Sequence, residues 1–149
     1  MRRAVVLPGL LLLALMGCGG SGSSGLSARD LRTQATHLCT IARQQTDRIA
    51  APSSAAGAAA FLNQGLAVLQ PELNALRQLN PSGDLGQVYK TAITAFAQKV
   101  DAVRTAATAL AGNGDPVTTM KSLEQQLAPL EEEENGAWQA LEIPACLNR

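Results

Sequence analysis

Apolar residues recur at alternating steps of three and four along four stretches of the chain, the spacing of one face of an α-helix. The first stretch carries Leu31, Ala35, Leu38, Ala42 and Ile49, with Gln45 in the same register. The second carries Leu62, Leu66, Leu69, Leu73 and Leu76. The third carries Leu85, Tyr89, Ile93, Phe96, Val100, Val103, Ala107 and Leu110. The fourth carries Met120, Leu123, Leu127, Leu130, Ala137 or Trp138, and Leu141.

Short breaks separate these four predicted helices. In residues 51–54, Pro52 removes a backbone donor and the serines that follow it offer N-caps for the second helix. Residues 80–83 and 112–114 end the second and third helices with Asn, Pro, Ser and Gly. Asp115 is the expected N-cap of the fourth helix, with Pro116 at its first position.

Helices joined by short breaks pack antiparallel to their neighbours, so the pattern predicts an all-α, up-down-up-down four-helix bundle. Pro71 and Pro129 fall inside the second and fourth stretches. Each lacks a backbone N–H and crowds the preceding turn, so we expect kinks or breaks near Gln70 and Ala128.

Composition agrees with helices and argues against a nucleic-acid partner. Ala and Leu dominate, and the aromatic residues are Phe61, Tyr89, Phe96 and Trp138, so a sheet is disfavoured. The chain holds 12 basic and 12 acidic residues; without Arg2 and Arg3 it would have 10 against 12, a net charge of −2. A basic footprint for nucleic acid is therefore absent, and we expect no nucleic-acid partner.

The N-terminus has the pattern of an export signal. Met1-Arg2-Arg3 is a short basic region, and residues 4–16 form an apolar run too short for a membrane span of about 20 residues. Leu15-Met16-Gly17-Cys18 then resembles the lipobox of bacterial lipoproteins. The resemblance implies a diacylglyceryl group on Cys18, cleavage after Gly17, and Cys18 as the mature N-terminus.

An ordinary cleaved signal with a coincidental cysteine fits less well because the A-x-A-like site is missing before Cys18. An uncleaved anchor fits less well because it would need more apolar residues. Gly and Ser make up residues 19–25, a composition typical of a flexible tether with a reach of about 15 Å. We therefore divide the chain into a signal peptide (1–17), the lipidated cysteine with its tether (18–26), and a helical domain (27–149).

Once Cys18 has a role as the lipid site, Cys39 and Cys146 remain as one pair. Thiols that can meet in an oxidising compartment normally oxidise. In the predicted topology the end of the fourth helix lies beside the start of the first, and Pro144 turns the tail toward Cys39. We expect a Cys39–Cys146 disulfide, worth about 4 to 5 kcal/mol for a loop of roughly 100 residues; two unpaired buried thiols are the alternative.

Three segments together resemble uncharacterised, Ala/Leu-rich helical lipoproteins of high-GC bacteria, actinobacteria especially. They are Leu38-Cys39, Leu79-Asn80-Pro81 and the stretch from Leu141 to Cys146. The resemblance implies a helical fold and an exported, lipid-anchored location on the outer face of the cytoplasmic membrane, and it brings no activity. Because Gly19 is not the Asp retention signal, an outer-membrane location is permitted in a host with two membranes.

His37, the sole histidine of the chain, carries every metal or acid–base hypothesis. Its position lies away from the apolar stripe, so we interpret it as a solvated helix-face residue. With no C-x-x-C-H motif, His37 and Met120 are the one available axial pair for a haem, and we do not favour it. We predict no metal site, cofactor site or catalytic residue.

Consecutive glutamates point in different directions around a helix, so most of Glu131-Glu132-Glu133-Glu134 should be a solvated face. Glu134 shares the register of Leu127, Leu130 and Leu141. Either the helix changes phase after Pro129, which we favour, or a polar group enters the bundle and marks a small-molecule pocket. Trp138 is interpreted as a packing residue.

The motifs of phosphate loops and nucleophile elbows are absent from the sequence, and we expect no enzyme. The leading interpretation is a lipid-anchored envelope protein whose bundle is a non-catalytic binding or structural module. Its partners would be the membrane, through the N-terminal lipid, and an envelope protein or wall component. The alternative is a carrier of an apolar small molecule or haem between the helices.

Overall fold

The four predicted stretches form four α-helices in a computed structural model, which describes residues 25–148. The helices are α1 (Ala28–Thr46), α2 (Ala58–Arg77), α3 (Asp84–Ala111) and α4 (Pro116–Ala140). Two short 3₁₀ turns are η1 (Ala55–Gly57) and η2 (Pro144–Cys146). Among the described residues there is no strand, so the prediction of an all-α fold is confirmed.

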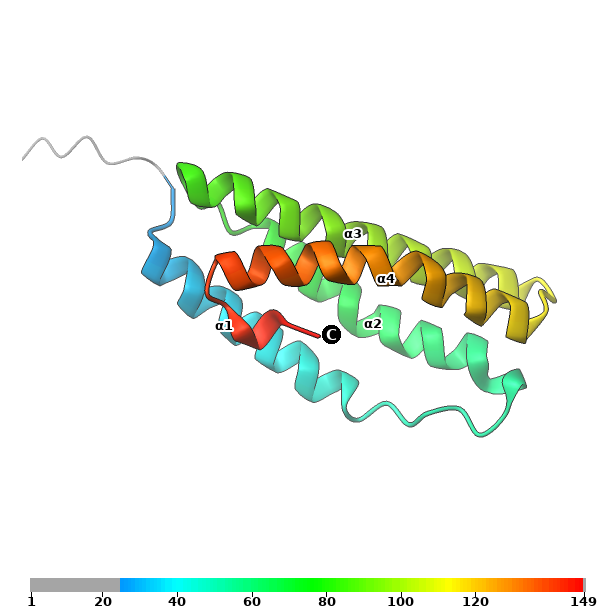
Figure 1. Ribbon diagram of the computed structural model, residues 1–149. Helices are drawn as coiled ribbons and strands as arrows, with labels where there is room; N and C mark the ends of the chain where they lie inside the picture. The colour runs from blue at the N-terminus through cyan, green and yellow to red at the C-terminus, as the bar shows by residue number, and fades with distance from the viewer. Residues whose placement is uncertain (1–24, 149) are drawn as a thin grey trace, which may run out of the picture.

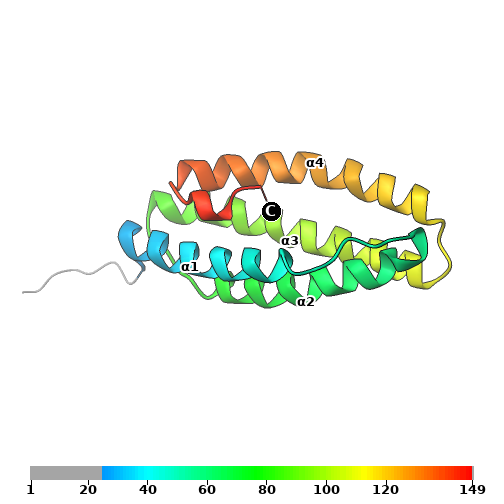
Figure 2. The same ribbon diagram turned by 90° about the horizontal axis from the view of Figure 1, so that it is seen from below.

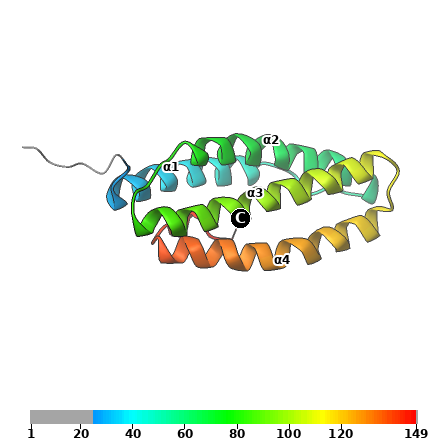
Figure 3. The same ribbon diagram turned by 90° about the horizontal axis from the view of Figure 1, so that it is seen from above.

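The helices alternate in direction along the bundle (Figure 1). Helix α2 packs on α1 and α3, and α3 packs on α4, so each helix contacts its neighbour in the sequence. Viewed from above, α2 and α4 lie on either side of α3 (Figure 3). The up-down-up-down arrangement is confirmed, and the turn η2 contacts both α1 and α4.

A side-chain cap begins two of the four α-helices. The Asp115 carboxylate accepts a hydrogen bond from the backbone N–H of Thr118 at 2.8 Å, as predicted for the cap of α4. The Ser27 hydroxyl does the same for the N–H of Asp30 at the start of α1. The predicted serine cap of α2 is wrong: Gly57 stands at that position and makes no side-chain cap.

Helix α1 is shorter than its apolar stripe predicted. It ends at Thr46, before Ile49, and Gln45 is exposed although it shares the register of the stripe. Backbone N–H groups of Asp47, Arg48 and Ile49 bond back to the last turn, and the chain then continues as residues 47–57 to the start of α2. This connection runs beyond the end of α1 along the bundle (Figure 2), where we expected only a short break.

Neither internal proline breaks its helix. Helices α2 and α4 continue through Pro71 and Pro129, and both prolines are exposed. Because each ring faces solvent, the missing N–H leaves no buried carbonyl without a partner. Of the kinks or breaks expected near Gln70 and Ala128, breaks do not occur.

Two clusters of buried side chains divide the bundle lengthwise. The first, which we call the stapled half, draws on all four helices and on the C-terminal hook (residues 141–148); it is built around Leu31, Leu76, Phe96, Trp138 and Ile143. The second, the open half, comprises Leu62, Val103, Ala106, Ala107 and Leu123, and α1 contributes nothing to it. The shortness of α1 thus leaves three helices and one loop at this end.

Candidate functional site

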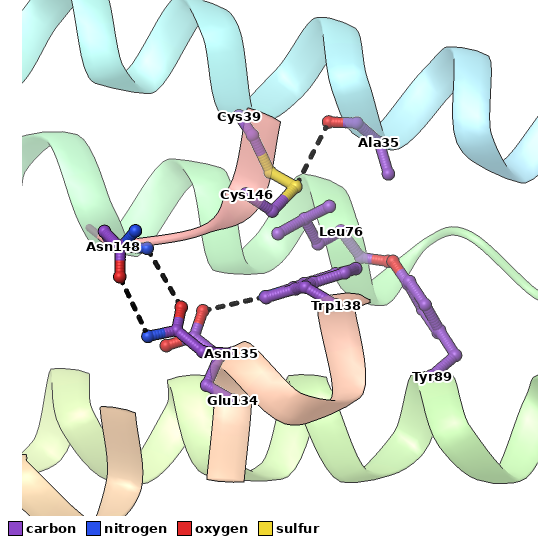
Figure 4. The surroundings of a disulfide bond; sticks show 9 residues. All are labelled: Ala35, Cys39, Leu76, Tyr89, Glu134, Asn135, Trp138, Cys146 and Asn148. Carbon is purple, nitrogen blue, oxygen red and sulfur yellow. Dashed lines mark hydrogen bonds between the residues drawn. A yellow bond between two sulfur atoms is a disulfide. The ribbon is translucent and has the colours of Figure 1, made fainter. Parts of the chain in front are cut away.

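The C-terminal hook is joined to α1 by the predicted disulfide. Cys39 and Cys146 are bonded, with their Cα atoms 5.2 Å apart and 107 residues between them in sequence. Both cysteines are fully buried, and the Cys146 Sγ lies 3.7 Å from the carbonyl oxygen of Ala35 (Figure 4). A disulfide sulfur carries no proton, so this approach is a packing contact. The disulfide prediction is confirmed, and two free thiols are excluded in this structure.

The hook turns back at a Schellman motif that ends α4. The Ile143 N–H bonds to the Trp138 carbonyl and the Glu142 N–H to the Gln139 carbonyl, with Glu142 in the left-handed region at φ 59°. Arg32 of α1 donates to the Leu141 carbonyl at 3.0 Å and pairs with the Glu142 carboxylate at 2.7 Å. These bonds fix the direction in which the chain leaves α4 toward Cys39.

A second link ties the end of the hook to α4. The Asn135 side chain donates to the Asn148 side chain at 3.2 Å and accepts from the Asn148 backbone N–H at 2.9 Å (Figure 4). The hook is therefore held by α1 on one side and α4 on the other.

The burial of Glu134 is the main correction to the sequence interpretation. It is 1% exposed and its carboxylate lies 3.0 Å from the Lys99 ammonium, which is itself 7% exposed. Leu123, Ala137 and Trp138 remain buried on the same helix, and Leu141 is buried just after its end, so the favoured phase shift after Pro129 is wrong. A polar group does enter the bundle there, as a charged pair between α4 and α3.

Two aromatic rings complete this polar cluster. The Trp138 Nε1–H donates to the Glu134 carboxylate at 2.9 Å, and the Trp138 ring meets the Tyr89 ring edge to face, with centroids 5.8 Å apart. The Tyr89 hydroxyl donates to the Leu76 carbonyl at 2.7 Å in the last turn of α2 (Figure 4). The cluster therefore links α2, α3 and α4, and Trp138 is a packing residue, as predicted, that also satisfies a buried carboxylate.

Burial controls the titration of this cluster. Desolvation raises the pKa of the Glu134 carboxyl, while the Lys99 charge and the Trp138 N–H act in the opposite direction. Desolvation likewise raises the pKa of the Tyr89 hydroxyl. Within the described part of the chain, every buried side-chain nitrogen and oxygen has a hydrogen-bond partner. Buried networks that are fully satisfied rigidify a core and fix how its helices pack.

Sequence reasoning missed Lys99. The lysine lies three residues after Phe96 in α3 and points into the bundle, with Glu131 at 3.7 Å as a second, half-exposed partner. A usable signal was present: two stripes predicted to be antiparallel neighbours each carry one residue of opposite charge close to the apolar register. Considering Lys99 and Glu134 together would have favoured a buried ion pair over a phase shift of the helix.

The residues proposed for other chemistry do not converge. His37 is exposed on α1, as predicted, whereas Met120 of α4 lines a hollow with Pro52 and Pro116 in the open half. Glu131, Glu132 and Glu133 are exposed, which confirms the solvated acidic face. In residues 25–148 no group of three or more His, Cys, Asp or Glu side chains is arranged to hold a metal ion.

The surface carries hollows at both ends of the bundle. One of about 640 Å³ follows one face of α4 in the open half, and we call it the α4 groove; it is lined by Val117, Met120, Lys121, Leu123, Glu124, Leu127, Ala128 and Glu131. A hollow of about 300 Å³ in the stapled half lies beside the α2–α3 loop. The α4 groove exists because α1 ends too early to cover this face.

Comparison with family models, with curated proteins and with solved structures finds no match to this chain. The predicted signal peptide, Cys18 and the tether up to residue 24 lie outside the described residues. None of the helices in the described part is long and apolar enough to cross a bilayer. Leu26, which we assigned to the tether, donates to the Asn80 carbonyl at 2.8 Å and belongs with the folded domain.

Proposed function

We propose that the chain is the precursor of a lipid-anchored protein of the bacterial cell envelope, exported and held through Cys18. Its bundle would act there as a non-catalytic binding or structural module. The observation that carries the proposal is the use of the three cysteines. Cys39 and Cys146 bond to each other, which leaves Cys18, within the lipobox-like Leu15-Met16-Gly17-Cys18, as the one cysteine that this disulfide does not use.

The disulfide supports the oxidising compartment that export implies. Structural disulfides between buried cysteines are typical of exported proteins and rare in the cytosol of mesophiles. Each half of the bundle has a helical core, and the tail is tied to α4 through Asn148. A small domain outside the membrane gains stability from such a closure.

Intact mass of the full chain, expressed in a bacterial host and extracted with detergent, tests the proposal. We expect a protein that begins at Cys18 with an added lipid mass, and a Cys18→Ser version without that mass. Reduction should add two protons to both, through Cys39 and Cys146. An uncut or unlipidated wild-type chain would overturn the proposal.

The α4 groove favours a second candidate function, a carrier of an apolar small molecule. Its volume of about 640 Å³ lies within the range of ligand pockets, and Val117, Met120 and Leu127 give it an apolar lining. The groove is built on one helix, so a ligand would be covered on one side only. Native mass spectrometry of protein purified from its host tests this candidate; an added mass lost in a Met120→Glu variant supports it, and a bare mass contradicts it.

Haem is the less supported cargo for such a carrier. His37 is exposed on α1 and Met120 lies in the open half, so the pair considered from the sequence does not face a common space. An absorbance band of the purified protein in the haem region would show that haem is bound despite the separation of His37 and Met120.

A further inference from the structure

The structure fixes the point at which the N-terminal segment meets the bundle. The Leu26 N–H donates to the Asn80 carbonyl, and Leu26 forms an isolated parallel bridge with Pro81. A Cβ on Gly25 would lie 2.6 Å from the Ser82 Cβ, so this backbone approaches the α2–α3 loop as closely as glycine allows. The chain therefore enters the fold at the stapled end (Figures 1 and 2).

This attachment limits how the bundle can face a membrane if Cys18 carries lipid. Seven residue steps separate Cys18 from Gly25, a span of at most about 25 Å. The 28 residues of α3 make a helix of about 42 Å. The open end lies farther from Gly25 than the tether can reach, so it cannot be the end that rests on the bilayer.

A basic hollow lies beside the same attachment point. Arg77 and Lys90, both exposed, flank a space of about 300 Å³ whose lining also includes Asn80, Pro81 and Ile93. Neither cation has an ion-pair partner among the described residues. Asn80 is the residue that binds Leu26, so the two charges stand where the lipid-bearing segment leaves the fold.

The acidic groups of this end do not cancel those charges. Glu142 is paired with Arg32, and the Asp30 carboxylate accepts the Ser27 hydroxyl at 2.7 Å. This end therefore holds three acids, Asp30, Asp84 and Glu142, against four basic residues, Arg29, Arg32, Arg77 and Lys90. Arg29, Arg77 and Lys90 have no ion pair in the described chain. Four minus three gives the stapled end a net charge of +1, on a chain whose net charge without Arg2 and Arg3 is −2.

We propose that the hollow between Arg77 and Lys90 binds the phosphate of anionic phospholipid headgroups, so that the bundle stands on its membrane with the stapled end down. The inference rests on the proposed lipid anchor and adds its orientation. Each basic residue near an anionic surface strengthens binding by a factor of about five. A gain of this size is enough to favour one orientation of a domain whose lipid anchor already keeps it at the surface.

The test uses the mature chain (18–149) with Cys18→Ser, which contains the complete bundle but no lipid. Its partition is measured at low ionic strength onto phosphatidylcholine vesicles with and without 30% phosphatidylglycerol, a composition of about one anionic lipid in three. We compare Arg77→Gln/Lys90→Gln with Arg104→Gln/Lys121→Gln. The second pair removes the same charge from the open half.

We expect binding to the anionic vesicles alone, weakened about 30-fold by Arg77→Gln/Lys90→Gln and nearly unchanged by Arg104→Gln/Lys121→Gln. Equal loss in both variants, or equal binding to neutral vesicles, overturns the inference. Inorganic phosphate at constant ionic strength should compete only at concentrations far above that of the vesicle lipid; competition at equal concentration would mean that the site takes free phosphate, and it would overturn the headgroup assignment.

Failure here is distinguishable from failure of the proposed function. A full chain without lipid mass, whose unlipidated form still binds anionic vesicles through Arg77 and Lys90, overturns the lipid anchor alone. A lipidated full chain, whose unlipidated form ignores the vesicles, overturns the headgroup site alone.

Discussion

The stapled half and the open half of this bundle are made of the same kinds of helix and differ in how they are closed. In the stapled half, α1 and the hook cover the core, and a disulfide, a buried ion pair and a Schellman turn connect the elements. In the open half, residues 47–57 replace the missing part of α1 and Val117 remains 73% exposed. Helix periodicity gives both halves their helices, whereas closure depends on contacts between residues far apart in sequence.

Removing the disulfide should have the largest effect on the stability of the stapled half. Cys39→Ala with Cys146→Ala should lower the free energy of unfolding by about 4 kcal/mol, because a loop spanning 107 residues is no longer closed in the unfolded chain. Denaturant unfolding of the double variant measures it, with the reduced wild type as a second route to the same state. A loss below about 1 kcal/mol would mean that the staple is redundant to the packing of α1.

Lys99→Met should cost about 3 kcal/mol, because it leaves the Glu134 carboxylate buried without its cation. The matched control is Arg104→Met on the same helix, whose pair with Asp101 is exposed and should be worth less than about 1 kcal/mol. Denaturant unfolding compares the two. Equal effects would contradict a special role for the buried pair.

Glu134 also gives the stapled half a pH dependence whose sign is fixed. Burial raises its pKa, so between its ordinary value near 4.5 and the raised folded value the folded state binds more protons than the unfolded state. The stabilisation is complete below that window and is lost as the pH rises through it. The wild type should therefore lose stability with rising pH relative to Glu134→Gln; a parallel pair of stability–pH curves would contradict the burial argument.

Gly25→Ala tests the attachment of the N-terminal segment. The added Cβ would clash with Ser82 and with the Asn80 carbonyl oxygen at 2.9 Å, so we expect faster hydrogen exchange at the Leu26 amide and a loss of about 1 kcal/mol. Gly65→Ala is the control, since no atom lies within 4 Å of its new Cβ and alanine favours the helix interior by about 0.5 to 1 kcal/mol. Protection of Leu26 that survives Gly25→Ala would show that the close approach is not needed.

Val117→Ser in the open half should have the smallest effect, within about 0.5 kcal/mol, because its side chain is largely in solvent already. Thermal unfolding measures it. A large loss would show that the α4 groove is covered in the free protein and that the two halves are equally closed.

The sequence predicts the parts of the molecule that depend on local pattern. The four helices, the Asp115 cap, exposed His37 and the disulfide all follow from spacing, capping chemistry and the cysteine count. The Lys99–Glu134 pair does not, because a charge within an apolar stripe gains meaning only from its partner on another helix. The early end of α1 was also missed, since Ile49 keeps the register of the apolar stripe although the helix ends at Thr46.

Hydrogen exchange of the lipidated protein on anionic vesicles, compared with the unlipidated Cys18→Ser mature chain in solution, tests most directly whether the stapled end faces the membrane. The account predicts added protection at residues 77–90 and at the start of α1, with none at residues 47–57 and 112–118. Protection concentrated on the loops of the open half, or equal at both ends, would contradict it.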